Sequence, residues 1–254
     1  MAFDIYVILL LFLTGLLFGT LSLLIGIKRP LHLKRIGSYC NKCQEQYEWY
    51  QLIPVVSYFF NKGVCPYCHK KLSLWYPILE LLSGILFSIA YIMYGFSYEL
   101  IILCILVFLT INICVSDFKY FIILDIPLII FSIIVLVLKF VFFGFKVFLL
   151  SVSSGALIFI FMLIIRFFGS KFFKQEALGG GDIKLATFFG FVLGLRLSIV
   201  SLILGSFLAF PYAIYCSMNK KNREIPFGPF LILGLDVTFI FMVYINNFLS
   251  IIFK

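Results

Sequence analysis

Residues 99–117, with the sequence ELIILCILVFLTINICVSD, decide the fold class of this chain. Between Glu99 and Asp117 the run carries no charged side chain. Coiled as an α-helix, a run of this length is close to what is needed to cross a hydrocarbon layer of about 30 Å. The run closes on a carboxylate, and an ionisable group in or at the end of a span is costly enough to suggest a function. The stretch therefore predicts a transmembrane helix that ends at a candidate functional residue, Asp117.

The rest of the composition agrees with a membrane environment. Of the 254 residues, 63% are hydrophobic and only 12% are charged, and the mean hydropathy is +1.16. A soluble domain of this length needs much more polar surface to cover its core. The 33 phenylalanines suit helices that face lipid and argue against a disordered chain.

Similar apolar runs recur along the sequence and predict an all-α membrane protein with about eight transmembrane helices. They cover residues 5–27, 77–95, 99–117, 121–143, 146–168, 183–195, 197–217 and 228–252. The sixth run is short and the break near residues 194–196 is weak, so seven spans remain an alternative. We expect three parts: a first transmembrane helix at 1–27, a small polar loop at 28–74 and a transmembrane core at 75–254.

The positive charges predict the orientation in the membrane. The chain carries 20 Lys and Arg residues against 11 Asp and Glu residues. With the N-terminus outside, sixteen of the cations fall in cytosolic segments, and only Lys139, Lys146, Arg196 and Lys254 remain outside. Positive residues concentrate on the cytosolic side of membrane proteins, so we expect the 28–74 loop in the cytosol. Because the cations lie scattered in short loops, they predict no nucleic-acid partner.

Four cysteines in the polar loop have the spacing of a metal site. Cys40 and Cys43 form one pair, and Cys65 and Cys68 form a second pair, with 21 residues between Cys43 and Cys65. Two residues between paired cysteines let both thiolates reach one tetrahedral ion, and two such pairs complete a closed, structural zinc shell. Disulfides are disfavoured in a reducing cytosol. We expect structural zinc, which would supply the folding free energy that so small a loop lacks.

Few residues could carry out chemistry in the membrane. Both histidines, His32 and His69, lie in the polar loop, which argues against Ser–His or Cys–His catalysis. Serine–lysine pairs exist, such as Ser116 with Lys119, but their lysines lie in solvated loops, where nothing would make them useful bases. The carboxylates in or beside spans remain.

Asp117 and Asp182 stand out among these carboxylates. Asp117 closes the run quoted above, and Asp182 follows three glycines in the stretch Leu178–Leu185. In the predicted topology both lie at cytosolic helix ends and share a depth. Glycines permit unusual backbone conformations and close approach of another chain. The simpler interpretations, a solvated helix end for Asp117 and a helix N-cap for Asp182, stay open at this point.

Five sequence blocks in order resemble the prepilin peptidase (type IV leader peptidase) family. They are the four-cysteine loop, Tyr76–Leu81 (YPILEL), Asp117 with a second acid eight residues later at Asp125, Gly179–Leu185 (GGGDIKL), and Ile225–Phe230 (IPFGPF). The glycine–aspartate block resembles the Gly-x-Gly-Asp signature of intramembrane aspartyl proteases. One departure is Leu124, where the family usually has proline. The blocks cover residues 40 to 235.

The resemblance implies a fold and an activity for this chain. It implies that Asp117 and Asp182 are the catalytic pair of an aspartic endopeptidase, with Asp125, Gly179, Gly180, Gly181 and Lys184 around the active site. Two carboxylates brought close cannot both ionise cheaply, so such a pair shares a proton and can serve as base and acid. Which residue takes which role is left open, because the two titrate together.

The resemblance also implies substrates, partners and location. The substrates would be prepilin or pseudopilin precursors, whose short basic leader is cut after glycine at the cytosolic face of the bacterial inner membrane. Membrane lipids are the other expected partner. Many relatives also methylate the new N-terminus with S-adenosylmethionine, and Glu80 is our candidate residue for methyl transfer. A structural hydrogen bond is the equally simple role for Glu80.

Two other functions compete with this interpretation. A membrane thiol oxidoreductase would use the paired cysteines as redox centres. A transporter or channel would use Asp117 and Asp182 to bind cations, but it needs a water path across the whole membrane, and charges near one face fit that poorly.

Overall fold

The computed structural model describes residues 2–27, 43, 45–173, 178–219 and 225–252. Within them, the regular structure is helical, apart from isolated bridge residues such as the antiparallel pair Val64 and Lys71. The chain forms two compact units, Met1–Val115 and Ser116–Lys254, which we describe separately. The predicted all-α class is confirmed.

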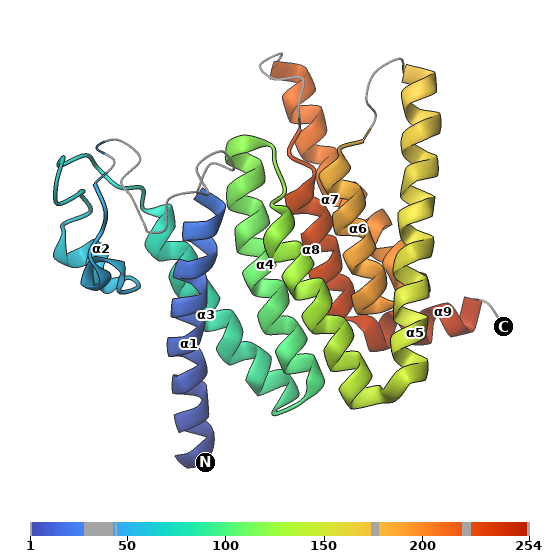
Figure 1. Ribbon diagram of the computed structural model, residues 1–254, viewed down its shortest axis with the longest axis horizontal. Coiled ribbons are helices and arrows are strands. Elements are labelled where there is room, and N and C mark those ends of the chain that lie inside the picture. Colours follow the sequence, from blue (N-terminus) through green and yellow to red (C-terminus); the bar gives the residue numbers. More distant parts are fainter. Residues whose placement is uncertain (1, 28–42, 44, 174–177, 220–224, 253–254) are drawn as a thin grey trace. The chain divides into compact units, whose positions relative to one another are not determined.

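Two long apolar helices pack together in the first unit, α1 (Ala2–Ile27) and α3 (Trp75–Tyr94) (Figure 1). Their backbones approach so closely that a methyl group added to Gly15 would lie 2.8 Å from the Cα atom of Gly84. Lipid offers no hydrophobic drive for helices to associate, so close packing at small residues is a main source of helix association there. The glycines thus hold α1 against α3.

Hydrogen bonds join α1 to α4 (Tyr98–Tyr120) inside the same unit. The Ser22 hydroxyl donates to the Phe108 carbonyl at 2.8 Å, and the Asn112 amide donates to the Ser22 carbonyl at 3.1 Å. The Ser22 and Asn112 side chains are buried. Interhelical polar contacts of this kind stabilise packing within lipid.

Between α1 and α3, the described part of the polar loop contains only short elements. They are a 3₁₀ helix, η2 (Trp49–Leu52), and a five-residue α-helix, α2 (Val56–Phe60). No residue of α2 is buried. The described loop therefore has little apolar core of its own, as the sequence predicted.

In the second unit, α5 (Asp125–Phe173) turns back on itself (Figure 1). The break is at Gly144, whose φ of 80° lies in the left-handed region that glycine tolerates. The break separates the two spans that we predicted at 121–143 and 146–168. Across it, the buried ammonium of Lys139 donates a hydrogen bond to Ser151 at 3.0 Å. The sequence had placed Lys139 only in an outer segment and gave no sign of this contact.

The short helix α6 (Gly180–Leu193) contacts α5, α7 (Leu195–Asn219) and α8 (Gly228–Ile240). A methyl group on Gly190 would lie 2.5 Å from the Cα of Gly155 in α5. The helix is largely buried, with Phe188 and Phe189 fully enclosed. Because α6 is held on several sides, its N-terminal end is firmly positioned.

The helices differ from the predicted spans in two places. Among the described residues, five helices are long and apolar enough to cross a membrane, or six if α8 and α9 (Met242–Ile252) count as one span, which is bent by 78°. The predicted sixth span corresponds to α6, which has only 14 residues. The predicted span at 228–252 is made of two helices, because the chain bends between α8 and α9. The protein is a multi-pass membrane protein.

Candidate active site and cysteine cluster

Asp117 lies in the last turn of α4 and belongs to the second unit. The residue is only 6% exposed. Its Oδ2 atom accepts a hydrogen bond of 2.9 Å from the backbone N–H of Gly228, the first residue of α8. A buried carboxylate needs such a donor, and the free N–H groups of a helix N-terminus are suited to an anion. Asp117 is therefore more than a solvated helix end.

Asp182 lies in the first turn of α6, where the N-cap residue is Gly179. The side chain is half-buried, and the Gly179 backbone N–H hydrogen-bonds to its carboxylate. An acidic residue at the third helical position that reaches back to the N-cap N–H resembles one half of a capping box. The N-cap interpretation of Asp182 itself is wrong, because Gly179 occupies that position.

The two aspartates line one cavity of about 840 Å³ in the second unit. Like charges on two carboxylates that line the same cavity repel one another. The walls come from the end of α4, the turn before α5, the start of α6 and the segment before α8. Apolar side chains in these walls are those of Phe121, Ile122, Leu178, Ile225 and Phe227. The cavity is large enough for water and part of a peptide chain.

Asp125 and Lys184 line the same cavity and pair with each other. The Lys184 ammonium lies 2.8 Å from both carboxylate oxygens of Asp125. Both side chains are about half exposed. The structure thus brings together both acids of the predicted motif, with Asp125 neutralised by a lysine and Asp117 facing Asp182.

The three glycines before Asp182 also line the cavity. None of them has a positive φ, so the expectation of an unusual backbone conformation is wrong here. What the structure supports is close approach. A methyl group on Gly181 would lie 3.1 Å from the Cβ of Ile123, and one on Gly179 would lie 3.0 Å from Asp182 Oδ2. Gly180 has more room, with Arg166 3.8 Å away.

Three of the four predicted metal ligands come together in the first unit. The sulfur atoms of Cys43, Cys65 and Cys68 lie within 4.8 Å of one another, and those of Cys43 and Cys65 are 4.0 Å apart. Thiolates around one zinc ion at about 2.3 Å lie roughly 3.8 Å from one another, so the spacing fits a shared metal. Cys40, the fourth predicted ligand, lies outside the described residues.

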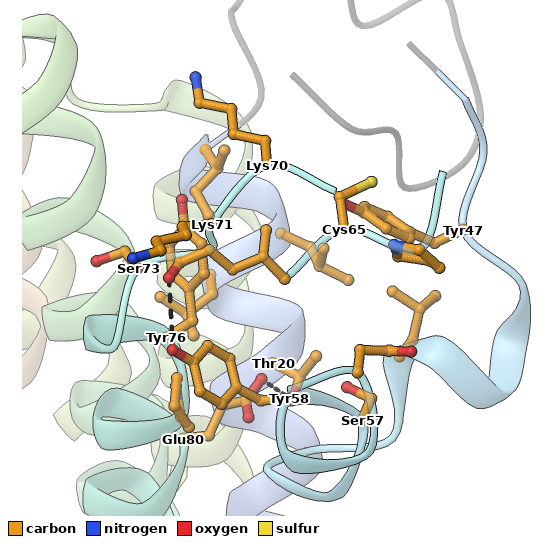
Figure 2. A pocket seen from close by; sticks show the side chains of 18 residues that line it. Thr20, Tyr47, Ser57, Tyr58, Cys65, Lys70, Lys71, Ser73, Tyr76 and Glu80 are labelled. Atoms are coloured by element: carbon orange, nitrogen blue, oxygen red, sulfur yellow. Dashed lines mark hydrogen bonds between the residues drawn. The ribbon is translucent and has the colours of Figure 1, made fainter. Parts of the chain in front are cut away.

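Glu80 is buried in α3, where its two carboxylate oxygens have different donors. The Thr20 hydroxyl donates to Oε1 at 2.8 Å, and the Val55 backbone N–H donates to Oε2 at 2.7 Å. Glu80 lines a separate cavity of about 330 Å³ in the first unit (Figure 2). Sequence reasoning singled out Glu80 but gave no sign of this cavity.

Sequence reasoning also missed two backbone donors, those of Gly228 and Val55. The block around Gly228 was noticed, but its N–H could be assigned no partner because Asp117 is 111 residues away. For Val55 there was no signal. Backbone donors leave no trace in side-chain identity, so only the fold shows them.

Most of this chain is similar in sequence to known proteins and protein families. Residues 13–94 match the Bacterial Peptidase A24 N-terminal domain, and residues 101–214 match the Type IV leader peptidase family. A prepilin leader peptidase/N-methyltransferase of Bacillus subtilis (strain 168) is 29% identical over 91% of this chain and 93% of its own length.

Two further proteins of the same name are similar over most of their length. The one from Vibrio cholerae is 30% identical over 80% of this chain and 80% of its own length. The one from Legionella pneumophila is 31% identical over 84% of this chain and 75% of its own length. No solved structure matches the chain. Similarity of this extent shows that the chain belongs to the type IV leader peptidase family.

Proposed function

We propose that this protein is an aspartic endopeptidase that removes the leader from type IV prepilin or pseudopilin precursors. The observation that carries the proposal is the meeting of Asp117 and Asp182 in one cavity. The relatives of this chain are named prepilin leader peptidase/N-methyltransferase. Family membership therefore favours a peptidase over a cation transporter or a thiol oxidoreductase.

The chemistry follows from the repulsion between the two carboxylates. A close pair holds one proton between its members. The ionised member takes a proton from a water molecule, whose oxygen attacks the scissile carbonyl. The protonated member gives its proton to the leaving amine, so the peptide bond breaks and the pair again holds one proton. The backbone N–H of Gly228 stabilises negative charge on Asp117.

The residues around the pair have positioning roles in this proposal. The glycines 179–181 keep side chains away from the space beside Asp182, where substrate backbone would lie. The Asp125–Lys184 pair contributes no net charge at the cavity wall. The proposed location is the inner membrane, with this cavity open to the cytosol, because positive residues concentrate in the loops on that side.

We propose structural zinc at the cysteine cluster, with Cys40, Cys43, Cys65 and Cys68 as ligands. The sulfur spacing of the three described cysteines fits a tetrahedral thiolate site. The ion would hold the polar loop, 28–74, as a small module between the first helix and the transmembrane core at 75–254. The membrane lipids around these parts are a proposed partner.

We also propose that the chain methylates the new N-terminus, as the names of its relatives suggest. S-adenosylmethionine, when bound, supplies an electrophilic methyl group for an amine. The Glu80 cavity fits such a molecule in size, since about 330 Å³ lies within the range of roughly 300–1,000 Å³ for small-molecule sites. Glu80 is the residue of this chain that we assign to that second activity.

Incubation of the purified protein with a synthetic prepilin peptide tests the peptidase. The wild type should release the leader, and Asp182→Asn should not, because asparagine keeps the size but cannot carry the proton. Cleavage by Asp182→Asn at the wild-type rate would refute the catalytic assignment.

A further inference from the structure

The cavity of the first unit has a chemical character that goes beyond its size. Its one described carboxylate, Glu80, is buried and is part of no ion pair in the described chain. Three half-buried tyrosines, Tyr47, Tyr58 and Tyr76, line the same space (Figure 2). A desolvated carboxylate and aromatic faces both attract organic cations.

The Glu80 carboxylate is held in place by a strained turn. Val55 has a φ of 60° and a ψ of −50°, and the N–H of Val56 bonds back to the Pro54 carbonyl. This is a γ-turn of the rare, strained kind, and a β-branched residue at positive φ is an outlier. The turn aims the Val55 N–H at Glu80 Oε2. Strain of this kind persists where the surroundings impose it, and it often marks a ligand site.

The two hydrogen bonds fix the carboxylate but do not neutralise it. The Thr20 hydroxyl and the Val55 N–H are both uncharged donors. They occupy one lone pair on each oxygen and leave acceptor capacity for a further group. A buried negative charge without a counter-ion is costly, and a cationic ligand would remove that cost.

Two lysines at the same cavity add a second recognition element. Lys70 and Lys71 are exposed and line the cavity. Their ammonium groups suit a ligand that carries a carboxylate of its own. The cavity therefore suits a molecule with an internal cation, an aromatic part for the tyrosines and a carboxylate toward solvent.

We propose that this cavity selects the methyl donor by charge: Glu80 favours the cationic sulfonium of S-adenosylmethionine over the neutral thioether of S-adenosylhomocysteine. The inference rests on the proposed N-methyltransferase function and deepens it. The same carboxylate that holds the donor loses its partner once the methyl group has left. The spent product is then bound less tightly and leaves the site.

The cavity around Asp117 and Asp182 cannot have this role. In the space around Asp117 and Asp182 the carboxylates face each other, and Asp125 already has its cation in Lys184. A third hollow near the N-terminus of α1 is lined by apolar and aromatic residues without a carboxylate. Among the described cavities, the Glu80 cavity alone combines an unpaired acid with aromatic walls.

Calorimetry on the purified full-length protein tests the proposal with three probes. They are S-adenosylmethionine, S-adenosylhomocysteine and sinefungin, which carries an ammonium group in place of the sulfonium. The wild type should bind the two cations at least about tenfold more tightly than the neutral product, which corresponds to about 1.4 kcal/mol. In Glu80→Gln the preference should fall to within about twofold, while the affinity for S-adenosylhomocysteine is kept.

The neutral probe and a matched variant control for folding. Glutamine keeps an acceptor for the Thr20 hydroxyl, and retained S-adenosylhomocysteine binding shows that the cavity is intact. Glu45→Gln removes one negative charge from an exposed position of the same loop, and it should leave all three affinities unchanged.

The outcomes separate this inference from the peptidase. The charge-selection proposal is overturned if Glu80→Gln keeps the preference for cations or loses all three ligands equally. It is also overturned if the wild type binds none of the three ligands. A wild type that binds with the expected preference but does not cleave a prepilin peptide would support the cavity and refute the peptidase.

Discussion

Two of the cavities in the described part of this protein use carboxylates in opposite ways. In the second unit, Asp117 and Asp182 line the same cavity, and we propose that they share a proton. In the first unit, Glu80 stands without another acid and accepts two neutral hydrogen bonds. A pair can donate and accept a proton, which hydrolysis requires. A single fixed charge is better suited to binding a cation.

Backbone N–H groups support the acids in both places, but they come from different structures. Asp117 is bonded by the first residue of α8, a regular helix N-terminus. Glu80 is bonded by Val55, a residue in a strained turn. The first arrangement follows from ordinary helix geometry. The second requires Val55 to adopt an unfavourable backbone conformation. We infer that this strain is retained because it fixes the position of the Glu80 carboxylate.

The largest expected effect comes from breaking the pair. Asp117→Asn and Asp182→Asn should each lower the rate of leader cleavage by roughly 10²–10⁴-fold, the range that general acid–base catalysis contributes. Cleavage assays on a prepilin peptide measure this, with thermal unfolding as the control for folding. If either variant keeps near wild-type turnover, that residue is not part of a catalytic pair. The proposed difference between a paired site and a single-carboxylate site is then wrong.

Removing the metal should act on the first unit only. Cys65→Ser and Cys68→Ser should each lose the bound zinc, because a closed four-thiolate shell does not tolerate the loss of one ligand. Metal analysis of protein purified without chelator gives the content, which should be about one ion per chain in the wild type. Cys104→Ala, in the apolar part of α4, is the control.

Cys65 also lines the Glu80 cavity, so the zinc variants should weaken ligand binding there while leader cleavage continues. Wild-type protein without zinc would contradict the proposed metal site. Loss of cleavage in Cys65→Ser would show that the two units are less independent than we propose.

A smaller effect is expected from narrowing the wall of the paired site. Gly181→Val should lower turnover at least about tenfold, or about 1.4 kcal/mol in the barrier, because even its Cβ would lie 3.1 Å from Ile123. Gly180→Ala is a matched control, since its added methyl group would lie 3.8 Å from the nearest atom. Steady-state kinetics on both variants decide whether close approach at Gly181 is required.

The smallest effect concerns the Asp125–Lys184 ion pair. Because both side chains are about half exposed, the pair should contribute at most about 1 kcal/mol. Asp125→Asn, Lys184→Gln and the double variant should each change kcat/KM no more than about fivefold, with the double variant close to the single ones. A loss in Asp125→Asn as large as in Asp117→Asn would place Asp125 in the catalytic group.

Orientation is open to a direct test that bears on both cavities. Cysteine residues introduced at the exposed positions Lys119 and Lys184 should be labelled by a membrane-impermeant thiol reagent from the cytosolic side of sealed vesicles. These substitutions are made in a variant from which the native cysteines outside the proposed metal site have been removed, so that only the introduced thiols can react. Labelling from the outer face alone would reverse the proposed topology and exclude cleavage of a cytosolic leader.

Much of the fold could be predicted from the sequence, since an apolar run long enough to cross a membrane has few alternatives to a helix. The runs therefore predicted the helical class and the break of α5 near Gly144. They did not predict the bend of 78° between α8 and α9, because residues 240–242 include no glycine, proline or charged side chain that would mark it. Hydropathy measures transfer into lipid and carries no information about direction.

For the site, the sequence by itself determined which side chains are chemically unusual: two aspartates at helix ends, four cysteines in pairs and a glutamate in an apolar run. Only the tertiary structure decided their partners. It placed Asp182 beside Asp117, gave Asp125 to Lys184, and set the Val55 N–H against Glu80. The physical reason is that hydrogen bonds and ion pairs depend on distances of about 3 Å, which helix packing fixes between residues far apart in the chain.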